Sequence, residues 1–200
     1  MARPRRDAHD VATTERILEA AERHFATYGR EGARLADIAE DAGIRRSSLL
    51  YHFGSKDALY EAVVHRVFLR LGATLQEAMQ APGSLAERID RIVDRFQAFL
   101  AEEPALAPVF LRELLAADGP GHALLLREVT PILDSIEAFA LRVGGDALRP
   151  GLPVRAAVMQ VASGILLAAA AGPAREPLFG EADHARTLAR LLFLRDPEVP

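Results

Sequence analysis

The sequence predicts an all-α protein of about nine helices, three in a small N-terminal domain and the others in a larger C-terminal domain. Three observations lead to this prediction. Apolar residues recur at spacings of three, four and seven over most of the chain, which is the period of an amphipathic helix. Glycine and proline pairs interrupt this pattern where helices would end. No segment alternates apolar and polar residues for long enough to form a strand, and no internal repeat is present.

The composition is that of a globular chain without thiol chemistry. Half of the 200 residues are hydrophobic and 26% are charged, which excludes a disordered polymer. There is no cysteine, so disulfide scaffolds and thiolate sites are excluded. The longest apolar run, Val161 to Ala171, is too short to span a bilayer, and no apolar segment follows the N-terminal arginines as in a signal peptide. We therefore expect a soluble, cytoplasmic protein without a membrane partner.

The net charge of −4 is unevenly distributed. Residues 1–60 contain ten basic and ten acidic residues, whereas residues 61–200 contain fourteen and eighteen. This distribution fits an N-terminal part that meets phosphates and a C-terminal part that does not. The signal is weak by itself, because binding depends on the local placement of charge rather than on the total.

Residues 1–12 carry Arg3, Arg5 and Arg6 around a proline and show no apolar pattern. We predict a flexible basic arm here. It is either a frayed terminus or an arm that touches the backbone or minor groove of DNA.

A long helix is predicted from about Thr14 to Tyr28, where Gly29 ends it. Its buried face would consist of Ile17, Leu18, Ala21, Phe25 and Tyr28.

The stretch from Leu35 to Lys56 predicts two short helices joined by a tight turn at Gly43, where glycine can take up a left-handed backbone. Ala39 allows the two helices to cross closely, and Leu49 seals their joint. Ala39, the glycine four positions later and Leu49 have the residue types and the spacing that are typical of a helix-turn-helix. The alternative is an ordinary helical hairpin with polar residues on its solvent-exposed face.

Further helices are predicted over residues 55–80, 85–101, 106–117, 122–143, 153–171 and 181–194, with a loop at residues 172–180. Ser55 is a good N-cap for the first of them, and Ser84 with Glu87 forms a capping box for the second. The domains would be a helix-turn-helix domain at residues 13–60 and a C-terminal domain at residues 61–200.

Residues 14–64 resemble the N-terminal DNA-binding domain of TetR-family transcriptional regulators. The matching residues follow in order through all the helices of this part: Ile17, Ala20-Ala21, Phe25, Gly29, Gly32, Asp37-Ile38-Ala39, Ala42-Gly43-Ile44, Leu49, Tyr51-His52-Phe53, Ser55-Lys56 and Leu59. The rest of the chain agrees with the family only in length and helical layout.

The resemblance implies a homodimer whose paired helices enter successive major grooves of a near-palindromic double-stranded DNA operator. Residues 45–52 would form the recognition helix. The likeness places Arg46, Ser47, Ser48 and Tyr51 at or near base edges, and His52 and Lys56 at phosphates. Lys56, the only lysine in the chain, lies in the first turn of a helix, where free backbone N–H groups favour an anion.

Three residues depart from the family pattern. Arg34 stands where a threonine that contacts a phosphate is common, Arg45 replaces the usual cap of the recognition helix, and Leu50 stands where a tyrosine is frequent. Arg34 can still reach a phosphate but cannot cap a helix. Arginines at this surface can instead bind guanine in bidentate fashion, which is worth roughly 1–3 kcal/mol of discrimination. Solvated surface charge is the alternative for Arg45 and Arg46.

By the same resemblance, residues 61–200 form an effector-binding and dimerisation domain. Helices 153–171 and 181–194 would pair with their copies across a four-helix interface; burial within one monomer is the alternative. The candidates to line an effector pocket are Phe96, Phe99, Phe110, Leu114, Ile132, Met159 and Val161, with Arg112, Glu113 and Gln160 to orient a ligand. The alternative is that these residues are plain core or solvated polar groups.

We expect a repressor without a cofactor or metal, released from its operator by a small, mostly apolar effector. An enzyme is disfavoured, because no two histidines lie at metal-ligand spacing and no nucleophile elbow or phosphate-binding glycine loop is present. The alternative is a DNA-binding regulator without an effector. A collapsed C-terminal core would favour this alternative, and a cavity of several hundred Å³, on the order of a ligand pocket, would favour sensing.

Overall fold

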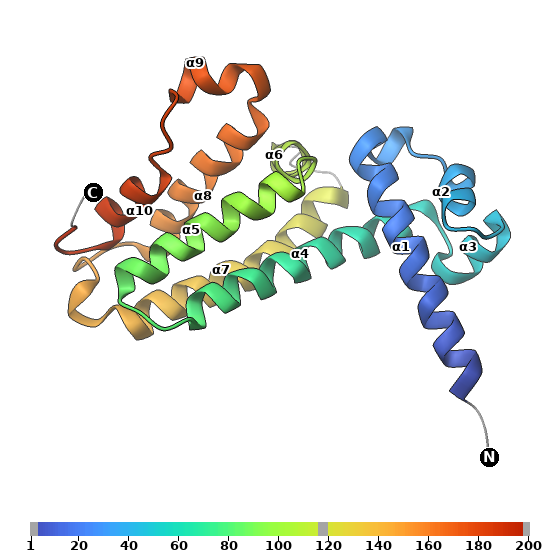
Figure 1. Cartoon of the computed structure of the whole chain (residues 1–200), viewed down its shortest axis with the longest axis horizontal. Helices are drawn as coiled ribbons and strands as arrows, with labels where there is room; N and C mark the ends of the chain where they lie inside the picture. The colour runs from blue at the N-terminus through green and yellow to red at the C-terminus, as the bar shows by residue number, and fades with distance from the viewer. Residues whose placement is uncertain (1–3, 116–119, 198–200) are drawn as a thin grey trace. The chain divides into compact units, whose positions relative to one another are not determined.

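The computed structural model describes residues 4–115 and 120–197 (Figure 1). Helices make up the fold, and no strand is formed within these ranges; Leu148 and Leu194 share an isolated β-bridge. The α-helices are α1 (Pro4–Gly32), α2 (Leu35–Asp41), α3 (Arg46–Phe53), α4 (Lys56–Gln80), α5 (Leu85–Glu102), α6 (Leu106–Leu115), α7 (Pro120–Gly144), α8 (Val154–Ala170), α9 (Arg175–Phe179) and α10 (Ala185–Phe193), with short 3₁₀ turns at Gly145–Ala147 and Gly172–Ala174. The all-α prediction is confirmed.

Two parts of the chain are more helical than the sequence indicated. α1 begins at Pro4, so residues 4–12, expected as a flexible arm, continue the helix; residues 1–3 lie outside the described ranges. Proline is favoured at a first helical position, because its missing N–H would have no helical partner there. α9 is a helix that was not predicted and lies in the segment expected as a loop. The 3₁₀ turn Gly172–Ala174, which contains Pro173, precedes it, and Gly180, at φ +82°, ends it.

The chain forms two compact units, which divide between Val67 and Phe68 within α4. In the N-terminal unit, α1, α2, α3 and the start of α4 enclose a core in which Ile17, Ile38 and Leu49 are fully buried. Phe25 packs edge-on against Tyr60 at 5.1 Å between ring centroids. The predicted burial of Tyr28 is wrong, since 61% of this residue is exposed. Its ring lies instead against His24 at the end of α1.

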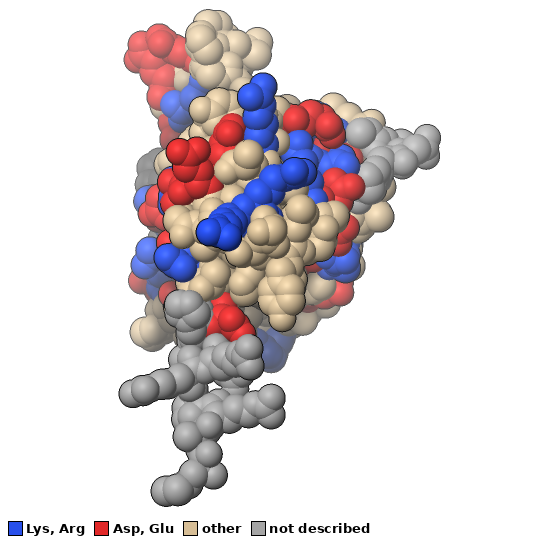
Figure 2. Space-filling view, turned by 90° about the vertical axis from the view of Figure 1, so that its right-hand side faces the viewer, with Lys and Arg blue, Asp and Glu red and all other residues tan. Residues whose placement is uncertain are grey.

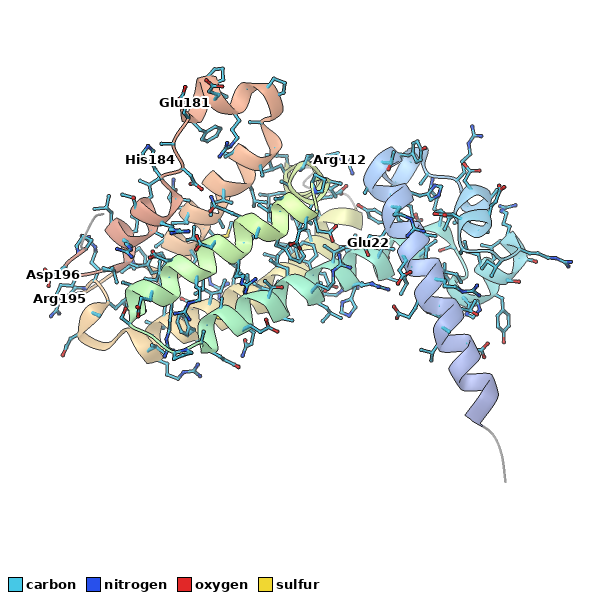
Figure 3. All side chains as sticks on the ribbon, in the orientation of Figure 1. Glu22, Arg112, Glu181, His184, Arg195 and Asp196 are labelled. Atoms are coloured by element: carbon cyan, nitrogen blue, oxygen red, sulfur yellow. The ribbon has the colours of Figure 1, made fainter. Side chains whose placement is uncertain are left out.

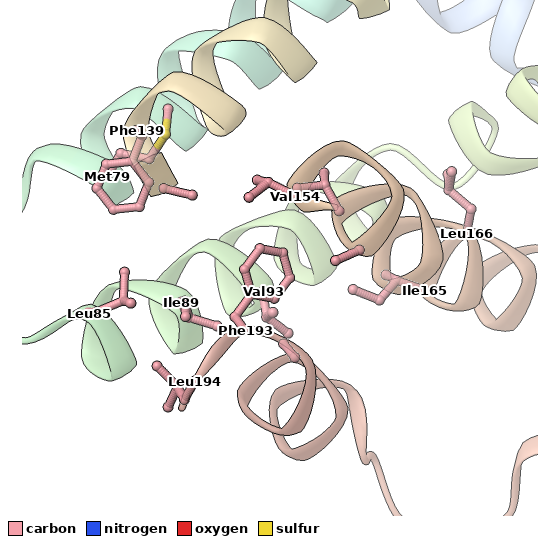
Figure 4. Packing of buried hydrophobic residues seen from close by; sticks show 14 of the residues in the cluster. Met79, Leu85, Ile89, Val93, Phe139, Val154, Ile165, Leu166, Phe193 and Leu194 are labelled. Carbon is pink, nitrogen blue, oxygen red and sulfur yellow. The ribbon is translucent and has the colours of Figure 1, made fainter. Parts of the chain in front are cut away.

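The C-terminal unit is built around α8, which contacts α5, α6, α7 and α10. Figure 4 shows Phe193 of α10 beside Val93 of α5, with Val154 and Ile165 of α8 around them. Two ion pairs also join α10 to α5: Arg190 binds Asp90, and Arg186 binds Asp94. Burial of apolar surface by several helices at once is what holds this unit together.

Within the described ranges, no single helix is long and apolar enough to cross a membrane. α8 meets that criterion only together with residues 172–179, from which it is bent by 118°.

Candidate nucleic-acid interface

The turn between α2 and α3 is built as a helix-turn-helix. Gly43 has φ +68°, a left-handed conformation that costs other residues roughly 1–2 kcal/mol. The turn is closed by the Gly43 N–H, which donates to the Glu40 carbonyl at 2.9 Å, and by the Ile44 N–H, which donates to the Ala39 carbonyl at 2.9 Å. Ala39 and Leu49 are 1% and 0% exposed where the helices cross. The structure therefore has the predicted joint, with α3 held at a fixed angle to α2.

The outer side of α3 is polar and exposed. Tyr51 is 85% exposed, and Arg45, Arg46 and Ser47 are exposed as well, while Ser48 is half-buried. Residues 42–56 contain three basic residues and no acidic one. Figure 2 views the molecule from the side of α2 and α3 and shows basic side chains crossing an uncharged area, with acidic residues at its margins. This arrangement can accept a polyanion.

The starts of α2 and α3 carry arginines in place of capping side chains. Arg34 and Arg45 have the extended backbone of an N-cap, and neither side chain bonds to a backbone N–H of its helix. The Arg45 carbonyl accepts hydrogen bonds from the Ser48 and Leu49 N–H groups at 2.9 and 3.1 Å. The prediction that Arg34 does not cap its helix is confirmed, and Arg45, which replaces the usual cap residue, does not cap α3 either.

Three arginines elsewhere in the N-terminal unit have acidic partners. Arg23 binds Asp41 at 3.0 Å, and Arg66 binds Glu15 at 2.6 Å. Arg30 donates two hydrogen bonds to one Asp57 oxygen, at 3.0 and 2.8 Å, and this bond raises the pKa of its guanidinium.

Among the described side chains of this unit, Arg34, Arg45 and Arg46 have neither an ion pair nor a side-chain hydrogen bond, and Arg16 has no ion pair but donates to the Thr13 hydroxyl at 3.4 Å. Binding of an anion by a paired guanidinium first requires the loss of its acidic partner, which costs part of the binding energy. Arg34, Arg45 and Arg46, whose side chains have no partner to lose, are therefore the arginines best placed to bind an added anion.

The two residues predicted at phosphates are tied to α1. The Lys56 amine donates to the Glu31 carbonyl at 2.9 Å, and His52 Nδ1 lies 3.4 Å from the Thr14 hydroxyl. An ammonium group has three donors, so Lys56 keeps two for another acceptor. The sequence analysis did not single out Thr14 or Glu31 for this role. Thr14 lies inside α1, and Glu31 acts through its backbone carbonyl, so neither leaves a side-chain pattern in the sequence that marks this contact.

The C-terminal unit contains a half-open apolar cavity of about 130 Å³. Of the predicted lining residues, Phe96, Phe110, Ile132, Met159 and Val161 lie in its wall. Phe99 is buried elsewhere in the core, and Leu114 is 37% exposed.

The polar candidates do not line this cavity. Arg112, on α6 (Figure 3), pairs with Glu113 at 3.2 Å. Gln160 lines a different, half-open space of about 770 Å³ beside α5, α8 and α10. The described residues hold no group of three or more potential metal ligands.

Known proteins share the sequence pattern of the N-terminal unit. Residues 17–63 match the family described as bacterial regulatory proteins, tetR family. The transcriptional regulator RutR from Escherichia coli O157:H7 is 35% identical over 135 residues, which is 66% of this chain and 61% of RutR. The repressor AcnR from Corynebacterium efficiens is 36% identical over 67 residues, 34% of this chain and 36% of AcnR. The chain thus spans less than two thirds of the length of either relative.

Solved structures resemble the whole fold. The fatty acid degradation regulator FadR from Bacillus halodurans superposes with a TM-score of 0.74 at 16% identity, covering 90% of this chain and 94% of that one. FadR from Bacillus subtilis, in complex with stearoyl-CoA, gives a TM-score of 0.73 at 16% identity and covers 89% and 96%. A TetR-family regulator from Rhodococcus sp. gives 0.70 at 19% identity, covering 90% and 95%. At such identities the likeness shows the fold alone.

Proposed function

Because the chain belongs to the TetR family of bacterial regulatory proteins and is a DNA-binding regulator, we propose that it is an effector-released repressor. It binds a near-palindromic operator as a homodimer and leaves it when a small, mostly apolar molecule binds the C-terminal unit. One observation carries the DNA-reading half of this proposal. Of the four described arginines of the N-terminal unit that lack an ion pair, three lie at the starts of α2 and α3, on the same part of the chain as the exposed Tyr51.

The base-reading surface in this proposal consists of Arg46, Ser47, Ser48 and Tyr51. Arg34, Arg45, His52 and Lys56 bind phosphates around it. Phosphate contacts fix the position of the protein, and contacts to base edges supply specificity. α3 is short and presents one side to solvent, as an element that enters the major groove must.

Dimerisation through α8 and α10 is supported by apolar residues that one chain leaves uncovered. Leu167 on α8 is 49% exposed, and Leu188 and Leu191 on α10 are 54% and 41% exposed. A Cβ at Gly164 of α8 would meet open space, so a partner helix can approach it closely. Contiguous exposed apolar surface is typical of an interface.

Release by an effector would act through α4. This helix begins at the DNA-reading unit, and its residues Phe68, Leu71 and Leu75 line the apolar cavity. In the proposed dimer, the distance between the two helix-turn-helix units depends on the position of α4 in each chain. An effector that binds one position of α4 more tightly increases the population of dimers with the corresponding distance.

The volume of the apolar cavity, unlike that of the half-open space of about 770 Å³, favours a second candidate function, a DNA-binding regulator without an effector. About 130 Å³ is well below the roughly 300–1,000 Å³ of a pocket that holds a drug-sized ligand. A cavity of this size accepts a molecule only if it is small or if side chains move.

Selection of bound sequences from a random DNA pool with the purified protein tests the proposal. Two half-sites about 34 Å apart, one helical turn, are the expected result for a dimer of this kind. Tyr51→Ala and Lys56→Ala should each weaken binding of the selected DNA in a gel shift at fixed salt while the dimer persists in sedimentation. Unchanged affinity in both variants would mean that the assigned surface is wrong.

A further inference from the structure

A second space in the C-terminal unit has basic and polar walls. This hollow of about 440 Å³ is lined by the C-terminal halves of α4 and α7 and by the first turn of α5. Five of its residues carry hydrogen-bonding groups: Gln76, Gln80, Arg88, Ser135 and Arg142. Among the described residues, no carboxylate lines it. Its chemistry is that of a site for an anion.

The hollow adjoins the apolar cavity. Phe139 lines both spaces. On α4, Leu71 and Leu75 line the cavity, and Gln76 and Gln80 line the hollow one turn further along. Because a helix rises 1.5 Å per residue, the centres of these two segments are about 8 Å apart. A molecule of modest length can therefore reach from one space into the other once the Phe139 ring turns aside.

The positive charge in the hollow is not neutralised by neighbouring acids. Arg142 is exposed and, within the described ranges, has neither a hydrogen bond nor an ion pair. Two acidic residues in the C-terminal half of α7, Asp134 and Glu137, are both bound by Arg155, and Asp146, in the 3₁₀ turn after α7, does not line the hollow.

Arg88 uses only part of its bonding capacity within the chain. It donates from Nε to the Gly83 carbonyl at 3.0 Å and from Nη1 to the Met79 carbonyl at 3.2 Å. A guanidinium has five N–H donors, so three remain. Arg88 and Arg142 together can hold one anionic group.

We propose that this chain binds amphipathic anions, with the apolar body in the cavity and a carboxylate or phosphate head on Arg88 and Arg142. The inference rests on the proposed function, because it names the chemical class of the effector. A guanidinium binds such heads with charge-assisted, often bidentate hydrogen bonds. The cavity alone offers no polar lining side chain, so an apolar molecule without a head would be held there with no fixed orientation.

This placement of the head also gives the ligand a hold on α4. The two carbonyl groups that accept from Arg88 belong to the last turn of α4 and the bend after it. An anion that draws the guanidinium away removes these bonds from the end of the helix. Binding in the hollow therefore acts on the element that continues into the DNA-reading unit.

The test uses the full chain and two probes of equal length, decanoate and 1-decanol, below the concentration at which they form micelles. Calorimetry should show that decanoate binds at least about ten-fold more tightly, the factor expected for one hydrogen bond to a charged group. Decyl phosphate serves as a second anion. Tighter binding of either anion than of decanol supports the proposal and identifies the preferred head.

Two variants locate the head. Arg142→Gln should weaken decanoate binding about ten-fold and leave decanol binding unchanged, because Arg142 has no structural partner to lose. Arg95→Gln is the matched control: Arg95 is exposed on α5 and lines neither space, so both affinities should stay as they are. Equal binding of anions and decanol, binding of no probe, or unchanged decanoate affinity in Arg142→Gln would overturn the inference.

A gel shift with the selected operator separates this inference from the proposed function. If decanoate binds with the expected dependence on Arg142 and also releases the DNA, both are supported. If it binds in this way and the DNA stays bound, the ligand class is right and release by that ligand is wrong.

Discussion

The two units of this protein begin their helices in different ways. In the C-terminal unit, α5 has a complete capping box: the Ser84 hydroxyl accepts from the Glu87 N–H, and the Glu87 carboxylate accepts from the Ser84 N–H. In the N-terminal unit, α2 and α3 have arginines at the same position, with no side-chain cap. Their first N–H groups are therefore left for another acceptor.

This difference in capping affects how much each helix start contributes to the stability of its unit. α2 and α3 have 7 and 8 residues, well under the length at which isolated helices become stable in water. Without caps they depend on the core beneath them. Free N–H groups and an arginine at a helix start attract phosphate, so in the proposed function the stability given up there serves binding. α5 has no such task and is capped in full.

The largest effect should come from the core of the N-terminal unit. Leu49→Ala removes the fully buried residue that joins α2 to α3 and should cost about 2–5 kcal/mol of unfolding free energy. Urea denaturation followed by circular dichroism measures it. Leu50→Ala, at a half-buried position on the same helix, should cost clearly less. Equal losses would show that α3 is not held by this joint.

The second-largest effect should be on operator affinity, when an arginine of α3 is replaced. Arg46→Gln should weaken binding by about 1–3 kcal/mol if the guanidinium contacts a base edge. Arg23→Gln, which removes an exposed arginine already paired with Asp41, is the control and should change affinity little. Fluorescence anisotropy with the selected operator at fixed salt measures both. Similar losses in the two variants would point to general charge rather than to a reading surface.

Exchanging the two kinds of helix start tests the comparison directly. Arg45→Ser introduces a cap on an extended backbone that suits it and should raise the unfolding free energy by about 1 kcal/mol while weakening operator binding. Ser84→Ala should lower the unfolding free energy by about 1 kcal/mol and leave operator affinity unchanged. If Arg45→Ser improved both properties, the arginine would have no role in binding.

The smallest effect concerns pH. The hydrogen bonds from Ser84 lower the pKa of the exposed Glu87 carboxyl. The stability that this residue adds is therefore complete above the pKa of the unfolded chain and is lost as the pH falls through the lower, folded value. In Glu87→Gln, the thermal midpoint should change less between neutral and acidic pH than in the wild type. An identical pH profile in both would exclude this contribution.

The sequence predicted the fold of the N-terminal unit in detail, because a helix-turn-helix depends on backbone geometry. A turn that needs Gly43, a crossing that needs Ala39 and a joint that needs Leu49 each leave a residue type at a fixed spacing. The exposed Tyr28 was missed because its place in the helical period matches the buried face, and only the packing of Tyr60 against Phe25 shows that the core is filled without it.

The candidate sites of the C-terminal unit were less predictable, because residues that line a cavity have the same apolar pattern as residues that fill the core. Phe96, Phe110 and Met159 were found among its lining residues from their apolar spacing, which is the spacing of any core residue. Phe99 shares that spacing and lies outside the wall. The basic hollow was not predicted, since Arg88 and Arg142 are 54 positions apart and only the packing of α5 and α7 brings them to one place.

Lys56 gives the chain an internal reporter of occupancy. It is the only lysine in the 200 residues, and its amine lies against the end of α1, within the surface assigned to DNA. An amine-directed reagent therefore has one side-chain target, apart from a free N-terminus. The rate at which that single position is labelled, read by mass spectrometry of one peptide, records how long the reading surface stays covered, without any change to the sequence.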